Sequence, residues 1–227
     1  MPALSKIPDF DPRNAPVIGI DSHLAAVPAL AQTPDALRQR FAVPPVWEPE
    51  IVREGVFSTR LPTHAAVLIS VVLREQPTVL LTERTAHLST HSGQVAFPGG
   101  KSDPEDVDAA ATALREAWEE VGLEARFVEV LGALPTYVTG TSFIITPIVG
   151  LVQPDCVLKP NPYEVADVFE VPLQFLLDPA HHHRHALEWQ GQRREWFSMP
   201  YQQQGTTHFI WGATAGMLRN FYRFLMA

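Results

Sequence analysis

Short β-branched runs, each bounded by Pro, Gly or Asn, are the feature of this 227-residue chain that most limits its fold. Residues 65–73 (AAVLISVVL) and 78–84 (TVLLTER) flank a turn-like REQP, so we expect them to form a β-hairpin. Residues 94–97 (QVAF) predict a third short strand, which we expect Pro98-Gly99-Gly100 to end. The pattern therefore predicts a sheet in the first half of the chain.

The second half continues this pattern around one central helix. Further strands are expected at residues 127–135, 142–152, 165–172, 194–201 and 207–212. Residues 213–226 (ATAGMLRNFYRFLM) have the pattern of an amphipathic helix. One helix amid strands, with another at the end, predicts an α+β fold built in layers.

The first fifty residues are richer in Pro and Ala and show little periodicity. Residues 33–42 (TPDALRQRFA) predict one helix there, capped by Thr33 or Asp35. We interpret residues 1–50 as an arm with a short helix, either packed on the rest or partly disordered. Residues 51–227 are then expected to form one domain.

Charge and cysteine content narrow the class of protein. The formal net charge of -8 argues against nucleic-acid and anionic-membrane partners, because both require a basic surface. Cys156 is the only cysteine, so an internal disulfide is impossible and a reducing compartment is expected. The first residues resemble no signal peptide, and no apolar run reaches the roughly 18 residues needed to span a bilayer. These features favour a cytoplasmic protein.

The central helix has recognisable ends and a recognisable buried face. Asp103 before Pro104, or else Asp106, is expected to cap its start, and Gly122 is expected to end it. The apolar positions that share one face are Ala110, Leu114, Ala117 and Val121.

Glu116, Glu119 and Glu120 are expected to project together, away from that buried face. Each like-charged pair at this spacing destabilises a helix by about 0.2–0.5 kcal/mol. A hard divalent cation would relieve the repulsion, but a solvated acidic face is the competing interpretation. The glycine pair just upstream favours the metal, because glycine lets the backbone approach a ligand closely.

Residues 100–123 resemble the signature box of the Nudix hydrolases, which reads Gly, five residues, Glu, seven residues, then Arg-Glu-apolar-x-Glu-Glu-x-Gly-apolar. The second half, REAWEEVGL, matches at every specified position from Arg115 to Leu123. The first half departs from the box, because Gly100 lies one residue too far from Arg115 and Asp106 stands in place of the first Glu.

A longer stretch, residues 80–123, resembles the coenzyme A diphosphatase (pyrophosphatase) subfamily. That subfamily carries Leu-Leu-Thr-x-Arg-Ser-x-x-Leu-x-x-His-x-Gly-Gln-Val-x-Phe-Pro-Gly-Gly ahead of the box, and Thr85 here replaces the Ser. Residues 161–165 (NPYEV) and 210–218 (IWGATAGML) resemble its later segments. The resemblance implies a Nudix-type mixed β-sheet sandwiched between helices.

The resemblance also implies an activity, the hydrolysis of coenzyme A or its thioesters. The products would be adenosine 3',5'-bisphosphate and 4'-phosphopantetheine or its acyl form. Alternatives are a Nudix diphosphatase for ADP-ribose, nucleotide sugars or modified nucleoside triphosphates, and a non-catalytic Nudix-fold ligand sensor. The partner would be a small-molecule substrate, and a homodimer is one assembly open to the chain.

Metal-binding roles follow from the same resemblance. Glu116 and Glu120 would be the main ligands of Mg²⁺ or Mn²⁺, with Glu119 as a shared ligand or a base and the carbonyl of Gly100 as a further ligand. Arg115 would orient a glutamate.

Other residues would act on the substrate. Arg84, Gln94 and Lys101 are expected to contact it or support the site. Glu164 is either the catalytic base or a strand-edge residue that faces solvent.

Histidines are further candidates for functional or metal-binding residues. His91 matches a position of the subfamily, where a structural and a functional role are both open. The run at residues 181–185 (HHHRH) is expected in a loop, where it would be solvated or would chelate a transition metal.

Overall fold

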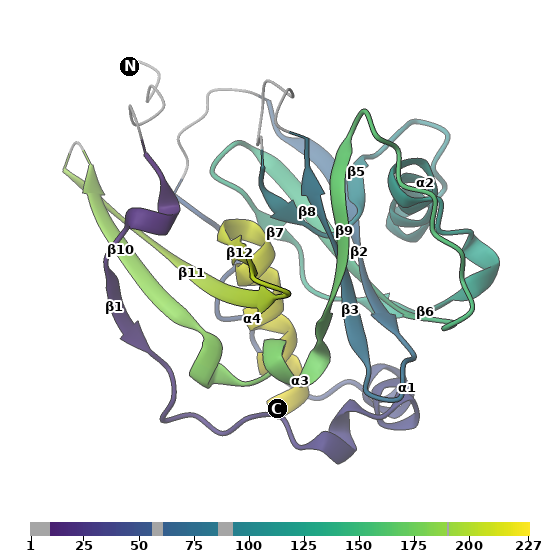
Figure 1. Ribbon diagram of the computed structural model, residues 1–227, viewed down its shortest axis with the longest axis horizontal. Helices are drawn as coiled ribbons and strands as arrows, with labels where there is room; N and C mark the ends of the chain where they lie inside the picture. Colours follow the sequence, from purple (N-terminus) through teal and green to yellow (C-terminus); the bar gives the residue numbers. More distant parts are fainter. Residues whose placement is uncertain (1–9, 56–60, 86–92, 190) are drawn as a thin grey trace.

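The computed structural model describes residues 10–55, 61–85, 93–189 and 191–227, which form two β-sheets with helices on their faces (Figure 1). The larger sheet has the order β4-β3-β2-β8-β6, with β5, β7 and β9 paired to β2, β8 and β3. Its strands are β2 (Thr63–Val72), β3 (Thr78–Arg84), β4 (Val95–Ala96), β5 (Gly99–Lys101), β6 (Val128–Ala133), β7 (Tyr137–Val138), β8 (Phe143–Val152) and β9 (Val165–Pro172).

The smaller sheet is antiparallel and has the order β1-β10-β11-β12. Its strands are β1 (Val17–Ile20), β10 (His183–Trp189), β11 (Gln192–Gln203) and β12 (Thr206–Trp211). The helices are α1 (Pro34–Ala42), α2 (Ala109–Val121), α3 (Leu173–Leu176) and α4 (Gly212–Met226), and short 3-10 turns lie at Pro12–Asn14, Ala29–Gln32, Ala125–Phe127 and Pro179–His181.

The larger sheet is mixed and is buried on both faces. Strands β2 and β8 pair in parallel along their full length, whereas β2 and β3 form the predicted antiparallel hairpin. Because side chains alternate along a strand, Leu68 and Val72 of β2 pack with α2, and Ile69 and Val71 pack with α4. The fold is therefore α+β with a mixed sheet sandwiched between helices, as the resemblance implied.

Helix α4 lies between the two sheets (Figure 1). It occupies the predicted residues, but twelve of its fifteen residues are buried, because the smaller sheet covers its second face. Arg219 and Asn220 are buried with partners from the first part of the chain. Arg219 pairs with Asp21 at 3.0 Å, and Asn220 donates to the carbonyl of Ile51. Packing on both sides therefore buries polar positions that an amphipathic pattern assigns to solvent.

The sequence missed one strand and misassigned another segment. Strand β4 ends at Ala96, ahead of Pro98 as predicted, but Gly99 and Gly100 then form β5 and pair with Val67 and Ala66 of β2. The glycines permit this close pairing, since a Cβ at Gly99 would overlap the backbone of β2. The histidine run is also no loop, because most of it belongs to β10.

Helix α2 begins later than expected. Its N-cap is Asp108, whose carboxylate accepts a hydrogen bond from the N–H of Ala111 at 2.8 Å. Asp103 and Asp106 do not cap the helix, because the Asp106 carboxylate is held by other partners. Gly122 ends the helix with φ 68°, as predicted.

The buried face of α2 is close to the predicted one. Ala117 and Val121 are fully buried, as predicted, and Ala113 is buried with them. Ala110 and Leu114 are only half-buried at the margin of the same core.

The described residues of the predicted arm pack against the rest of the chain. Thr33 caps α1 by accepting a hydrogen bond from Ala36, which confirms one of the two predicted caps. Strand β1 pairs with β10, and Arg38 of α1 forms a bidentate ion pair with Glu129 of β6. The division into residues 1–50 and 51–227 stays a prediction. Within the described ranges, no helix is long and apolar enough to cross a membrane.

Candidate active site

Glu120 of α2 faces the glycine pair of β5 from a buried position. Helix α2 packs on β2 and β5, which turns the C-terminal half of the helix toward Gly99 and Gly100. The Glu120 side chain is only 4% exposed, and its Oε2 accepts a hydrogen bond from the N–H of Gly99 at 3.3 Å. The expectation that all three glutamates project away from the buried face was therefore wrong for Glu120.

Glu116 lies against Gly100, and Glu119 does not. A Cβ at Gly100 would overlap the Glu116 carboxylate, so only glycine leaves room for that carboxylate in its place. Glu119 is 45% exposed and lies on the outer side of the helix. Successive residues of a helix point about 100° apart, so Glu119 and Glu120 cannot share one direction.

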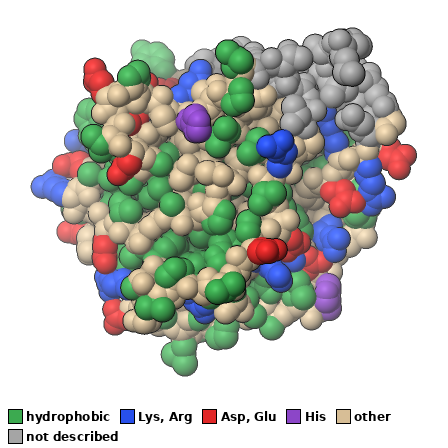
Figure 2. Space-filling view, turned by 180° about the vertical axis from the view of Figure 1, so that it is seen from behind, with side chains coloured by type: hydrophobic (Ala, Val, Ile, Leu, Met, Phe, Trp, Pro, Cys, Tyr) green, Lys and Arg blue, Asp and Glu red, His purple; other side chains and the backbone are tan. Residues whose placement is uncertain are grey.

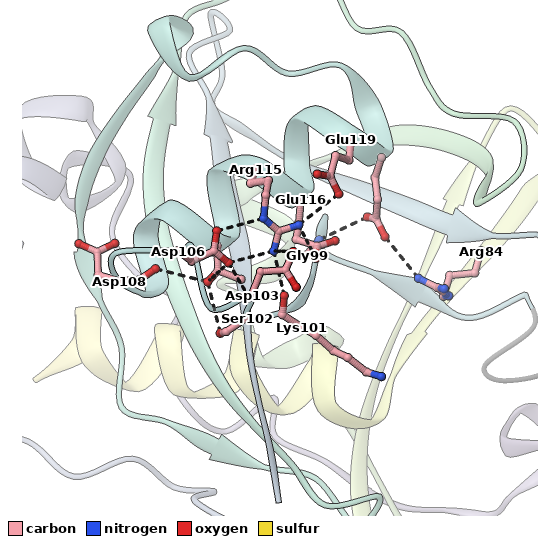
Figure 3. Close-up of polar contacts among 12 residues, drawn as sticks. Arg84, Gly99, Lys101, Ser102, Asp103, Asp106, Asp108, Arg115, Glu116 and Glu119 are labelled. Atoms are coloured by element: carbon pink, nitrogen blue, oxygen red, sulfur yellow. Dashed lines mark hydrogen bonds and ion pairs between the residues drawn. The ribbon is translucent and has the colours of Figure 1, made fainter.

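Arg115 joins the acidic residues into one network (Figure 3). Its Nη1 donates to Glu116 at 3.0 Å and to Glu119 at 3.1 Å. Its Nε and Nη2 donate to the two oxygens of Asp106, and Nη2 also donates to the carbonyl of Lys101. The guanidinium thus links the glutamates of α2 to the segment between β5 and the helix.

Asp106 anchors this network and does not face the glutamates as a ligand. It accepts hydrogen bonds from Thr112 Oγ1 and from the N–H of Asp103, in addition to Arg115. Hydrogen bonding to Arg115 holds the pKa of Asp106 far below its usual range. The position that departs from the signature box therefore fixes Arg115.

Burial disfavours the charged forms of Glu116 and Glu120, and a nearby cation would stabilise those forms. The pKa of Glu120 is raised to about 7, chiefly by burial and further by the negative charges of Glu116 and Glu164. Burial also raises the pKa of Glu116, although Arg115 opposes the effect. A cation placed between such carboxylates would restore their charged forms.

The donor set fits a hard divalent ion, with fewer carboxylates than the sequence suggested. Across the described ranges, no three His, Cys, Asp or Glu side chains are gathered closely enough to hold a metal on their own. Glu116 and Glu120 nevertheless offer carboxylate oxygens beside the glycine backbone, which is the oxygen-rich donor type that Mg²⁺ or Mn²⁺ prefers. The remaining ligands of such an ion would be water and substrate phosphates.

The three residues expected to contact the substrate lie in different places. Arg84, the last residue of β3, approaches Glu120 Oε1 with Nη1 at 3.3 Å. Lys101 is exposed, and its side chain extends away from the acidic network (Figure 3). The amide nitrogen of Gln94 lies beside Gly212 at the start of α4. Arg84 thus contacts a glutamate of α2.

Glu164 lies near the glutamate pair. It is half-buried at the entry to β9, and its negative charge raises the pKa of both Glu116 and Glu120. Asn161 Nδ2 donates to Glu164 Oε1 at 3.1 Å, which leaves Oε2 as the oxygen without this bond. Sequence reasoning did not single out Asn161, although an Asn before Pro three residues ahead of an acid is typical of a turn.

The histidine run has structural partners. His182 is fully buried, donates from Nε2 to the carbonyl of Leu176 at 2.8 Å and accepts from Arg219 at Nδ1. His185 is also buried, with Nε2 2.8 Å from Ser198 Oγ. His91 lies outside the described residues.

The chain is similar to known proteins over the region that contains this site. The family model for the NUDIX domain matches residues 62–190. The chain is 46% identical over 155 residues to an uncharacterized Nudix hydrolase NudL of Photorhabdus laumondii, covering 68% of this chain and 81% of that protein. It is 45% identical over 157 residues to the NudL of Escherichia coli K12, covering 69% and 79%.

Solved structures resemble parts of the chain. A MutT protein from Methanosarcina mazei is 23% identical with a TM-score of 0.42, covering 53% of this chain and 84% of that one. The NUDIX domain of Shewanella oneidensis NrtR, solved with ADP ribose, is 20% identical with a TM-score of 0.38, covering 50% and 75%.

The matched domain contains Glu116, the buried Glu120 and the glycines of β5, so these findings define the class of protein. The protein is an enzyme, a hydrolase that acts on diphosphate linkages of small-molecule substrates. The chain belongs to the Nudix hydrolase family, whose members generally use divalent metal ions. Membership favours the enzyme over the non-catalytic sensor.

Proposed function

We propose that this enzyme hydrolyses the diphosphate of coenzyme A or its thioesters, with Mg²⁺ or Mn²⁺ as the cofactor. One observation carries the proposal. Arg84 belongs to the stretch that resembles the coenzyme A diphosphatases, and its side chain contacts Glu120 of the family signature. The stretch ahead of the signature box and the glutamates of α2 thus meet in one place.

In the proposed site, Glu116 and Glu120 hold the divalent ion, together with the carbonyl of Gly100. When bound, the ion neutralises the diphosphate and lowers the pKa of the attacking water. Arg115 positions Glu116 through its 3.0 Å hydrogen bond. Glu119 contacts the same guanidinium from the outer side of the helix, so it would become a further ligand only by turning toward the ion.

Glu164 is proposed as the base. Its Oε1 is engaged by Asn161, so Oε2 takes the proton of the attacking water. The water oxygen bonds to phosphorus as the anhydride P–O bond breaks, and the leaving phosphate carries away the electron pair. Glu119 is the alternative base, and Glu164 has the advantage that it lies free of the Arg115 network.

Substrate recognition is assigned to local cations, because the chain carries a net charge of -8 and the substrate is anionic. Arg84 lies closest to the glutamates, whereas Lys101 and Gln94 would reach more distant parts of a long substrate. A site that pairs with a group discriminates strongly against a ligand that lacks it. The 3'-phosphate of coenzyme A is such a group.

A substrate panel with mass-spectrometric product identification tests the proposal. Coenzyme A and acetyl-coenzyme A should have a higher kcat/KM than ADP-ribose and should yield adenosine 3',5'-bisphosphate. Equal efficiency on dephospho-coenzyme A would remove only the 3'-phosphate contact. Efficient cleavage of ADP-ribose, nucleotide sugars or modified nucleoside triphosphates without attack on coenzyme A would overturn the proposal.

The proposal places the enzyme in the cytoplasm as a homodimer. Hydrophobic side chains gather over the middle of the face shown in Figure 2, with most charged side chains around them. Such a face is typical of a contact surface. Light scattering of the purified enzyme should give twice the chain mass of 25.2 kDa, and a monomer would contradict the dimer.

A further inference from the structure

Arg84 and Arg115 serve different carboxylates. Arg115 donates to Glu116, Glu119 and Asp106, so each branch of its guanidinium is engaged. Arg84 lies apart from this network in Figure 3, and its Nη1 contacts Glu120 Oε1 at 3.3 Å. Within the described ranges, Arg84 is therefore the side-chain cation of Glu120.

The two oxygens of Glu120 have little freedom. Oε2 is held by the N–H of Gly99 at 3.3 Å, and the side chain is only 4% exposed. Oε1 is therefore the oxygen that remains for a cation, and Arg84 approaches it. Arg84 itself is 29% exposed, so its guanidinium can move toward solvent without crossing the core.

A divalent ion at Oε1 would meet the guanidinium at short range. Carboxylate oxygens bind Mg²⁺ at about 2.1 Å, which would place the ion within a few ångströms of Arg84. Two cations repel strongly at that distance in a partly buried site. The anionic substrate offers the displaced guanidinium a new partner, since Arg binds phosphate oxygens through a planar fork.

We propose that Arg84 and the divalent ion compete for the Glu120 carboxylate, so that ion binding releases Arg84 toward the phosphates of the substrate. The exchange couples metal binding to substrate binding, because the Arg84 guanidinium becomes available to the substrate when the metal is in place. This inference rests on the proposed metal role of Glu120, and it does not depend on coenzyme A being the substrate.

Metal titration without substrate tests the competition. Calorimetry with Mg²⁺, and with Mn²⁺ in parallel, would compare the wild type, Arg84→Gln and Lys101→Gln at one fixed pH. Arg84→Gln should bind the ion about tenfold more tightly, because a competing charge is removed. Lys101→Gln loses the same charge from an exposed side chain and should change affinity by no more than about twofold.

Two further variants test whether the change in metal affinity depends on the charge of Arg84 and on the Glu120 carboxylate. Arg84→Lys retains the charge without the fork and should bind the ion with an affinity between those of the wild type and Arg84→Gln. In a Glu120→Gln background, Arg84→Gln should no longer tighten metal binding, because the contested carboxylate is absent. Unchanged or weaker metal binding in both Arg84 variants would overturn the proposal.

Steady-state kinetics at saturating metal give the second readout. Arg84→Gln should raise KM for the diphosphate substrate about tenfold, the opposite direction to its effect on metal affinity. A residue with a merely structural role would weaken both, and that result would refute the exchange. If coenzyme A is not cleaved, the proposed function fails, but the metal titration still decides the competition.

Discussion

Replacing Gly100 with Ala would place a methyl group against the Glu116 carboxylate. The added Cβ would lie 2.6 Å from Glu116 Oε1 and still closer to Oε2. An ordinary contact between carbon and oxygen is about 3.3 Å or more, so the carboxylate must retreat by roughly 1 Å to clear its nearer oxygen. The change is therefore aimed at one proposed metal ligand.

The expected effect on activity is large and the effect on stability is small. A misplacement of about 1 Å can cost about 100-fold in rate, so we expect kcat/KM to fall by roughly 30- to 100-fold. The carboxylate is the end of a rotatable side chain, and moving it off its rotamer costs about 1 kcal/mol. Loss of glycine from the unfolded chain offsets about 0.4–1 kcal/mol of that cost.

Kinetics and urea unfolding of Gly100→Ala would be compared with Gly19→Ala, because a Cβ at Gly19 meets nothing within 4 Å. The control should keep wild-type kcat/KM. Metal affinity should weaken in Gly100→Ala alone. Wild-type turnover in a stably folded Gly100→Ala would refute the position assigned to Glu116.

Other expected outcomes follow from the same geometry. Turnover should require a divalent ion and vanish with a chelator; full turnover in chelator after metal removal would remove the metal site. Glu120→Gln should lower kcat by orders of magnitude while keeping cooperative unfolding, because it relieves repulsion within α2, and loss of cooperative unfolding would make Glu120 structural. Glu164→Gln should do the same if Glu164 is the base, and a mild effect would return that role to Glu119. Burial lowers the pKa of His182 to about 4, against about 6.5 in the unfolded chain, so the unfolded chain binds more protons between these values. Stability should therefore fall with pH from about 6.5 to 4, by up to about 3 kcal/mol, and a His182→Gln variant with the same pH slope in urea unfolding would contradict this.

Local patterns in the sequence were enough to locate most strands of the larger sheet, though not β5 and β7, and both long helices. The β2–β3 hairpin follows from two β-branched runs around a turn, and the end of α2 follows from Gly122. The spacing of the acids on α2 is likewise a local property. These features depend on neighbours within a few residues, which is the range over which backbone preference and periodicity act.

Contacts between distant segments decided which acids of α2 and its approach are buried and which partners they bind. Glu120 is buried and Glu119 is exposed, although they are adjacent, because α2 packs on β2 and β5 and Glu120 faces Gly99 of β5. Asp106 fixes Arg115, which leaves Asp108 to cap the helix.

His185 of β10 is buried because β1 and β11 pair on either side of that strand, and no local signal carries such pairing. The sequence by itself determined which residues form α2, β3 and β9 beside the site and which acids they carry, but it did not reveal β5. Only the tertiary structure decided which carboxylates are desolvated and which cation each one meets, because desolvation and ion pairing depend on segments far apart in the chain.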